Sequence, residues 1–248
     1  MRGDRNIPQA SSLNRSFFKC RPEADTTLSR KHVASNSRAD QFNLDVPDLF
    51  FDEQAETRIT KRNLPHWQQD GKLYFVTWRQ GDSLPSEKRE QLQRDRDAWQ
   101  RPHGAKKLKD LSLTQQKLYY QLFDHRVQQW LDAGSGSCVL KQEGPRRIVV
   151  DALHHFNGTR YKLGTFAVAG NHVHVLVAPL QGQSLTKILH SWKSFTSNAI
   201  NEQLQRTGAL WKHESSDHLV RNEEALDRIS NYILRHAERG NYVEVLPF

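Results

Sequence analysis

Runs of aromatic and β-branched residues predict a set of strands in the second and third quarters of the chain. "KLYFVTWR" (72–79) is one such run, and "NHVHVLVAP" (171–179), which ends at a proline, is another. The segment "FNGTRYKLGTFAVAG" (156–170) begins with a turn at Asn157–Gly158 and continues as a strand. Because Gly170–Asn171 then leads directly into the next strand, we expect an antiparallel β-hairpin at this point.

Apolar residues at intervals of three and four predict the helices. The clearest signals belong to 222–240, where Asn222 is a good N-cap, Glu223 and Glu224 occupy the first turn, and Gly240 follows the last turn. We expect helices over 113–132, 144–156, 184–204 and 222–240, and one more whose first turn holds Pro85.

The order of these elements favours an α+β fold. Strands joined by a tight turn pair antiparallel, which argues against a doubly wound parallel sheet, and "SSDHLVR" (215–221) adds a short strand. Residues 1–60 are polar with little periodicity, so we expect a flexible N-terminal extension. Residues 61–248 are then one folded domain, with a helical insertion at about 85–156.

Composition narrows the class of partner. The chain of 248 residues carries a net charge of +8, which suggests a polyanion such as nucleic acid. Two cysteines, Cys20 and Cys138, make neither a disulfide framework nor a zinc-finger spacing, which is typical of a reducing cytoplasm. The sequence contains neither a long apolar run nor a signal-peptide core at its start, so we expect no membrane partner.

His172 and His174 are the first candidates for chemistry. Residues two apart in a strand point to the same side of a sheet, so the two imidazoles project together and can bind a divalent cation. The alternative is a pair of hydrogen-bonded strand residues. Spacing does not choose a third ligand among the other histidines and the carboxylates.

Tyr232 and His236 are one helical turn apart within the apolar stripe of the last predicted helix. Two ordinary interpretations are open at this point. Tyr232 can be a half-buried core tyrosine, and His236 can be a cation that interacts with the C-terminal end of the helix dipole.

An ordered set of stretches resembles the HUH-type single-tyrosine transposases, and most closely the REP-associated tyrosine transposases. The resemblance covers about residues 60–245. The stretches that carry it are "LPHWQQDGKLYFVTWRQGDSLP" (64–85), "WLDAGSGSCVL" (130–140), "NHVHVLVAP" (171–179), "ILHSWKSFTSNAIN" (188–201), "GALWKHESSDHLVRNEEAL" (208–226) and "YILRHAERG" (232–240).

This resemblance implies a ferredoxin-like antiparallel sheet with helices packed on it and a metal-dependent nicking and rejoining activity. His172 and His174 match the metal ligands of the family, and Tyr232 matches the nucleophile that forms a 5′-phosphotyrosine. The family usually has Asn or Gln one turn after the tyrosine, whereas this chain has His236. The implied cofactor is Mg²⁺ or Mn²⁺, bound by His172, His174 and His236.

The implied partner is single-stranded DNA that carries a palindromic hairpin, bound by a monomer or homodimer associated with the nucleoid. Cations suit phosphates and tryptophans suit base stacking. The candidate contacts are Lys187, Trp192, Lys193, Trp211, Lys212, Arg221 and Arg235. The basic stretch "HGAKKLKD" (103–110) is a candidate for contact with the hairpin stem.

Two further functions remain compatible with the sequence. The departure at His236 allows a catalytically idle DNA-hairpin-binding protein of the same fold. A replication initiator that uses the same chemistry is the other, and activity on an origin rather than on a chromosomal repeat would identify it.

Overall fold

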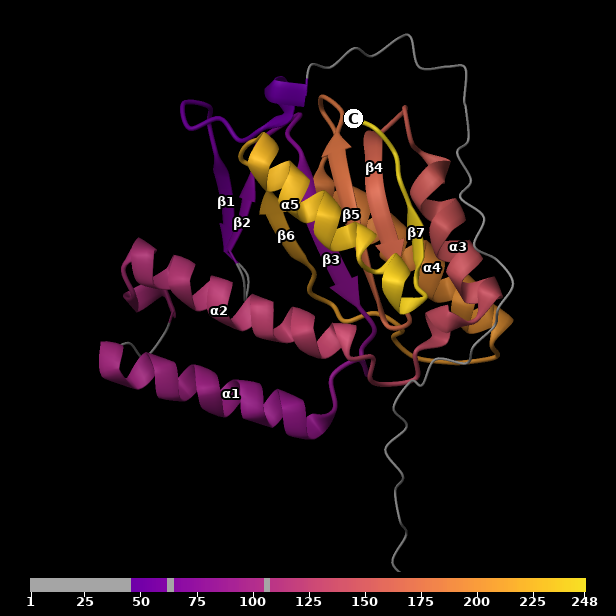
Figure 1. The fold of residues 1–248 in the computed structure, drawn as a ribbon, viewed down its shortest axis with the longest axis horizontal. Helices are drawn as coiled ribbons and strands as arrows, with labels where there is room; N and C mark the ends of the chain where they lie inside the picture. Colours follow the sequence, from indigo (N-terminus) through magenta and orange to yellow (C-terminus); the bar gives the residue numbers. More distant parts are fainter. Residues whose placement is uncertain (1–45, 62–64, 105–107) are drawn as a thin grey trace, which may run out of the picture.

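The structure is a computed structural model that describes residues 46–61, 65–104 and 108–248 (Figure 1). Its longer elements are, in chain order, β1 (Arg58–Lys61), β2 (Pro65–Gln68), β3 (Tyr74–Arg79), α1 (Ser86–Gln100), α2 (Leu113–Asp132), α3 (Glu143–His155), β4 (Tyr161–Val168), β5 (His172–Pro179), α4 (Leu185–Gln203), β6 (Ser216–Leu219), α5 (Glu223–Leu234) and β7 (Tyr242–Glu244). None of the helices in the described part of the chain is both long enough and apolar enough to span a membrane.

The main sheet has five strands in the order β6-β3-β5-β4-β7, and every neighbouring pair is antiparallel. Strands β3, β4, β5 and β6 are the first to fourth strands of a βαββαβ unit, and their spatial order is that of a ferredoxin-like sheet. The predicted hairpin is β4–β5, and Ala169 N–H donates to the His172 carbonyl at 2.9 Å across its turn. The expected α+β antiparallel fold is therefore confirmed.

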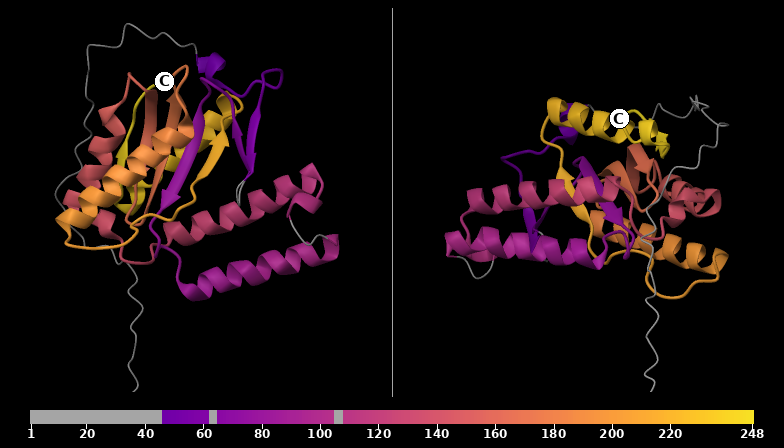
Figure 2. Two further views of the ribbon diagram at one scale, coloured as in Figure 1. Left: turned by 180° about the vertical axis from the view of Figure 1, so that it is seen from behind. Right: turned by 60° about the horizontal axis from the view of Figure 1, so that its bottom comes forward.

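The two faces of the sheet have different partners. In β5, Val173, Val175 and Val177 pack into the large core beneath α3 and α4. Leu176 instead packs with Ile233 of α5 on the opposite face. Figure 2, seen from behind, shows α4 across the first face, and Figure 1 shows α5 across the second. Because strand residues alternate, His172 and His174 lie on the α5 face.

Helices α1 and α2 form an antiparallel hairpin beside the sheet, with a small core of its own (Figure 1). Leu92, Tyr119 and Phe123 are the buried residues of that core. Within the expected insertion at 85–156, α3 behaves differently, because it packs against α4 as the helix that connects β3 to β4. The hairpin α1–α2 is thus the part that a ferredoxin-like unit does not need.

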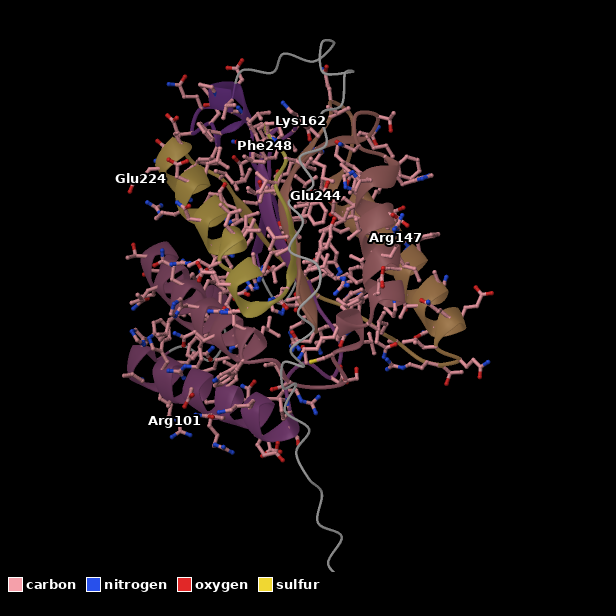
Figure 3. The ribbon with its side chains drawn as sticks, turned by 45° about the vertical axis from the view of Figure 1, so that its right-hand side comes forward. Arg101, Arg147, Lys162, Glu224, Glu244 and Phe248 are labelled. Carbon is pink, nitrogen blue, oxygen red and sulfur yellow. The ribbon has the colours of Figure 1, made fainter. Side chains whose placement is uncertain are left out.

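The expected N-terminal extension, 1–60, falls largely outside the described residues. Its described end packs on the domain: Leu49 is buried, and its carbonyl accepts a hydrogen bond from Leu73 N–H at 2.7 Å. At the other terminus, Phe248 returns to the sheet at the β-bulge of β4, and Lys162 Nζ lies 5.9 Å from the centre of its ring (Figure 3).

The last helix is shorter than the sequence predicts. Asn222 caps it as expected by accepting from Ala225 N–H at 2.9 Å, but α5 ends at Leu234 rather than near 239. A tighter 3₁₀ turn follows, in which His236 N–H donates to the Ile233 carbonyl at 3.1 Å. Gly240 then takes a left-handed conformation, with φ 73°, and ends the turn.

Candidate metal centre

His172 and His174 project from β5 into a buried space between the sheet and α5. Their side chains are 1% and 0% exposed. The Nδ1 atom of His172 donates to Asn171 Oδ1 at 2.7 Å, and Nδ1 of His174 lies 2.8 Å from Thr77 Oγ1 on the neighbouring strand β3. These hydrogen bonds orient both rings and leave Nε2 of each to face the space, as partners of metal-binding histidines commonly do.

His236 reaches the same space from the turn after α5. Its side chain is 1% exposed, and its ring centre is 4.8 Å from that of His174 and 5.5 Å from that of His172. The predicted proximity of Tyr232 and His236 also holds, with ring centres 5.3 Å apart, although the helix proper ends between the two residues.

Asp132, the last residue of α2, completes the cluster. Its Oδ1 atom lies 3.5 Å from His172 Nε2 and 3.7 Å from His236 Nε2. One ligand atom from each of Asp132, His172, His174 and His236 can be chosen so that all lie within 4.8 Å of one another. A group of three imidazoles and one carboxylate in this arrangement could hold a metal ion.

Sequence reasoning did not single out Asp132. The residue stands in "WLDAGSGSCVL" (130–140), which resembles a connector of the transposase family, and that resemblance was the available signal. It was weak, because the chain contains 28 acidic residues and no spacing rule links a helix-terminal Asp to a strand 40 positions later. Arg239 and Thr77, which hold members of the cluster, were missed for the same reason.

The polar atoms of the cluster fit a cation. Among the described residues, His172 Nε2 and both ring nitrogens of His236 are buried without a hydrogen-bond partner. A buried polar atom left unpaired costs on the order of 1–3 kcal/mol, so such atoms are rare unless they have a ligand. A metal ion that accepts imidazole lone pairs removes this cost.

The protonation states of the cluster side chains also suit metal binding. Burial, reinforced by the charge of the other histidines, lowers the pKa of His174 well below its usual value and lowers the pKa of His236 to about 4. Burial alone would raise the pKa of Asp132, but its interactions with His172 and with the Arg239 guanidinium outweigh burial and lower that pKa to about 2. Neutral imidazoles and an ionised carboxylate are the forms that bind metals.

Tyr232 extends from α5 to the edge of the cluster. Its hydroxyl is 3.3 Å from His174 Nε2 and 3.4 Å from Asp132 Oδ1, and its ring packs edge-on against Phe75. Burial and the nearby Asp132 carboxylate raise the pKa of this phenol, so it is protonated at neutral pH. The side chain is only half-buried, which leaves the hydroxyl beside both the cluster and the surface.

The two tryptophans expected to stack bases are in the core instead. Trp192 is 3% exposed and Trp211 is 6% exposed. Trp192 stacks on Trp78, with ring centres 5.7 Å apart, and donates to the Tyr161 hydroxyl at 2.9 Å. Protein covers their ring faces, which leaves no room for a base.

The candidate cations divide between the two sides of the sheet. Lys187 and Lys193 belong to α4, on the face opposite the cluster, and Lys193 Nζ donates to the Lys212 carbonyl at 2.8 Å. Arg221 lies over the Phe51 ring, 5.1 Å from its centre. Arg235 is exposed and near enough to Tyr232 and His236 to affect the pKa of both, so it is the candidate that the fold brings to the cluster.

Comparison with known families agrees with this geometry. Residues 147–236 match the family described as "Transposase IS200 like". This match makes about a third of the chain similar to the IS200-like transposases. The segment contains His172, His174 and Tyr232 and ends at His236, whereas Asp132 precedes it.

Other comparisons add little to this partial match. A solved structure described as "Structure of the REP associates tyrosine transposase bound to a REP hairpin" is 11% identical, with a TM-score of 0.39 over 71% of this chain and 72% of that chain. This likeness is too distant to assign a role to any residue. No curated protein matches the chain significantly.

Proposed function

We propose that the chain is a metal-dependent single-stranded DNA endonuclease and strand transferase that acts on palindromic hairpin repeats. The proposal rests on the position of Tyr232, whose hydroxyl lies 3.3 Å from an imidazole nitrogen of a buried three-histidine cluster. The IS200-like segment and the net charge of +8 support DNA as the substrate.

His172, His174 and His236 hold the metal in this proposal, and Mg²⁺ or Mn²⁺ is the proposed ion. A divalent ion held by these residues would supply Lewis-acid polarisation of the scissile phosphate and compensation for the negative charge that develops on it. Asp132 orients the Tyr232 hydroxyl, which lies 3.4 Å from its Oδ1 atom. Arg235, exposed near the cluster, is the proposed contact for a phosphate next to the cleaved bond.

The proposed reaction is a transesterification at phosphorus. The Tyr232 oxygen forms a bond to the phosphorus while the bond from phosphorus to the 3′ oxygen breaks, and that oxygen leaves as a 3′-OH with a proton equivalent to the one given up by the phenol. The product is a 5′-phosphotyrosine. Attack by the 3′-OH of another strand reverses the step and joins the two strands with no external energy source.

The test is a denaturation-stable adduct between the protein and a single-stranded repeat hairpin in Mg²⁺ or Mn²⁺. We expect the wild-type protein to form the adduct and Tyr232→Phe to lose it while hairpin binding is kept, because Phe lacks the nucleophilic oxygen. Tyr242→Phe is the matched control, since Tyr242 is also half-buried but hydrogen-bonds to Glu244 on β7, and this variant should form the adduct normally.

Chelation with EDTA, or the double substitution His172→Ala and His174→Ala, should also stop cleavage. An adduct that persists in Tyr232→Phe would refute the role of that tyrosine, and nicking that continues in EDTA would refute the metal role. Tight hairpin binding without an adduct in any divalent metal would instead identify a catalytically idle DNA-binding protein of the same fold.

A further inference from the structure

We propose that Asp132 of the inserted hairpin α1–α2 is a fourth ligand of the metal centre, and that the four ligands together make the centre prefer Mn²⁺, Co²⁺ or Zn²⁺ over Mg²⁺. The inference rests on the proposed function, because it concerns the same site. It adds a ligand from outside the IS200-like segment 147–236 and replaces the open choice of metal with an order of preference.

The position of Asp132 is the first support. Its Oδ1 atom faces two of the three histidines, 3.5 Å from His172 Nε2 and 3.7 Å from His236 Nε2. Two metal ligands in a tetrahedral site are about 3.3–3.6 Å apart when each metal–ligand distance is about 2.0–2.2 Å. Small side-chain movements therefore bring the carboxylate and the imidazoles onto one ion.

Arg239 prepares the carboxylate for this role. Its Nη1 donates to Asp132 Oδ2 at 2.7 Å, which leaves Oδ1 as the oxygen that faces the histidines. Arg239 lies in the turn after α5, so this ion pair joins the inserted hairpin to the segment that supplies His236. A partner that holds one oxygen of a ligating carboxylate is a usual feature of metal sites.

The chain that follows α2 holds Asp132 in place. Leu131 is buried, and the loop after it is tied to the turn that follows β3 by Ser137 N–H, which donates to Asp82 Oδ2 at 2.8 Å. Gly136 in the same loop lies so close to the Asp82 carbonyl that a Cβ atom would be 2.6 Å from its oxygen. The carboxylate thus comes from a fixed helix end rather than from a free loop.

The chemistry of the four ligands determines which divalent metal the centre prefers. Mg²⁺ favours six oxygen ligands in an octahedron and retains much of its water, whereas imidazole nitrogen suits the transition metals. Three imidazoles and one carboxylate offer three nitrogen donors for one oxygen. Affinity at such a site rises from Mn²⁺ to Co²⁺ and is also high for Zn²⁺. Mg²⁺ has the least to gain from it.

The test is metal binding to the full-length protein without DNA, with Mg²⁺, Mn²⁺ and Zn²⁺ titrated separately. Calorimetry gives the affinities, and the Mn²⁺ electron paramagnetic resonance signal reports the ligand field directly. We expect one ion per chain, and Mn²⁺ bound at least about tenfold more tightly than Mg²⁺. Equal affinity for Mg²⁺ and Mn²⁺ would overturn the proposed preference.

Asp132→Asn and Asp132→Ala then test the ligand itself. Both should weaken Mn²⁺ and Zn²⁺ binding by about tenfold or more, and the alanine variant should show the larger effect because the asparagine amide retains an oxygen. Asp124→Asn is the matched control, because Asp124 is on the same helix but faces His218 instead of the cluster, and it should bind metal like wild type.

The outcomes separate this inference from the proposed function. Unchanged affinity in Asp132→Ala, with binding abolished in the double substitution His172→Ala and His174→Ala, would overturn the role of Asp132 and leave the histidine centre intact. Unchanged affinity in the double histidine variant would refute the proposed centre altogether. Native circular dichroism spectra of the Asp132 variants ensure that weaker binding reports the missing ligand.

Discussion

The histidine cluster places three polar rings where an apolar core would otherwise form. His236 is the extreme member, since it is 1% exposed and, within the described part of the chain, neither of its ring nitrogens has a hydrogen-bond partner. Such a residue destabilises a protein that contains no ligand, because its polar atoms are removed from water without compensation. Sites that bind ligands often contain strained or unsatisfied groups, which lower the stability of the protein but serve its function.

The substitution His236→Leu tests whether His236 lowers the stability of the metal-free protein in return for metal binding. The free energy of unfolding of the metal-free protein should rise by on the order of 1 kcal/mol, because an apolar side chain of similar size replaces unsatisfied nitrogens. The rise in melting temperature that Mn²⁺ gives to the wild type should largely disappear, since binding to the folded state alone produces it.

Thermal unfolding with and without Mn²⁺ measures both effects. His190→Leu, at an exposed position of α4, is the control and should keep the metal response. A variant that loses stability in the absence of metal, yet responds to Mn²⁺ like wild type, would contradict the assignment of His236 as a ligand.

At the scale of elements, the site depends on three segments that meet at one place: strand β5, the end of α5 with the turn after it, and the end of α2. The first two belong to the ferredoxin-like unit, and both β5 and α5 lie within the matched segment 147–236. The third comes from the inserted hairpin, and the loop at 133–138 decides where it ends. That loop is held to the turn that follows β3 by Asp82, which Ser137 and Gly136 both contact.

The substitution Gly136→Ala should therefore disturb both stability and metal binding. Gly136 has φ 85°, and an added Cβ would also meet the Asp82 carbonyl oxygen at 2.6 Å. We expect destabilisation by more than about 1–2 kcal/mol, the usual cost of a left-handed conformation alone, because the loop must also move. Weaker Mn²⁺ binding should accompany it as Asp132 moves with the loop.

The substitution Gly71→Ala separates the cost of the left-handed conformation from the cost of the clash with Asp82. Gly71 has φ 70°, but a Cβ there meets nothing within 4 Å, so this control carries the conformational cost without the clash. Chemical denaturation gives the free energies, and Mn²⁺ titration gives the affinities. Equal destabilisation and unchanged Mn²⁺ binding in both variants would show that the Asp82 contact does not position α2.

At the scale of the whole molecule, the net charge of +8 favours a polyanion, but the fold distributes the candidate cations over more than one surface. Lys187 and Lys193 belong to α4, which covers the face of the sheet opposite the cluster, whereas Arg235 lies beside the cluster. The described residues of the stretch 103–110, which are 103–104 and 108–110, lie where α1 leads into α2. Its residues 105–107 are outside the described residues, so contact with a DNA stem stays a prediction.

Replacement of Lys106, Lys107 and Lys109 by Gln should weaken hairpin DNA binding and reduce its dependence on salt. Each phosphate that a lysine neutralises on a duplex adds about 0.9 to the slope of log affinity against log salt concentration, so the slope should fall by that amount for every such lysine removed. Fluorescence anisotropy over a range of salt concentrations measures the slope. The control Lys187→Gln should leave it unchanged, and an unchanged slope in the triple variant would exclude binding of the stem by this stretch.

The sequence by itself determined the local geometry of the site. The two-residue repeat of a strand put His172 and His174 on one side of the sheet, and the helical repeat put Tyr232 and His236 side by side. The same local patterns predicted the β4–β5 hairpin and the Asn222 cap. These features depend on neighbours within a few residues, whose relative positions the backbone geometry restricts.

Only the tertiary structure decided which distant residues lie beside the histidines and Tyr232. Asp132 reaches the histidines from a helix 40 positions earlier because a hairpin packs beside the sheet, and no periodicity encodes that meeting. The burial of Trp192 and Trp211 likewise depends on how α4 covers the sheet, and a sequence pattern cannot tell a core tryptophan from a surface one. Local repeats specify which face a side chain takes, whereas long-range packing specifies what that face meets.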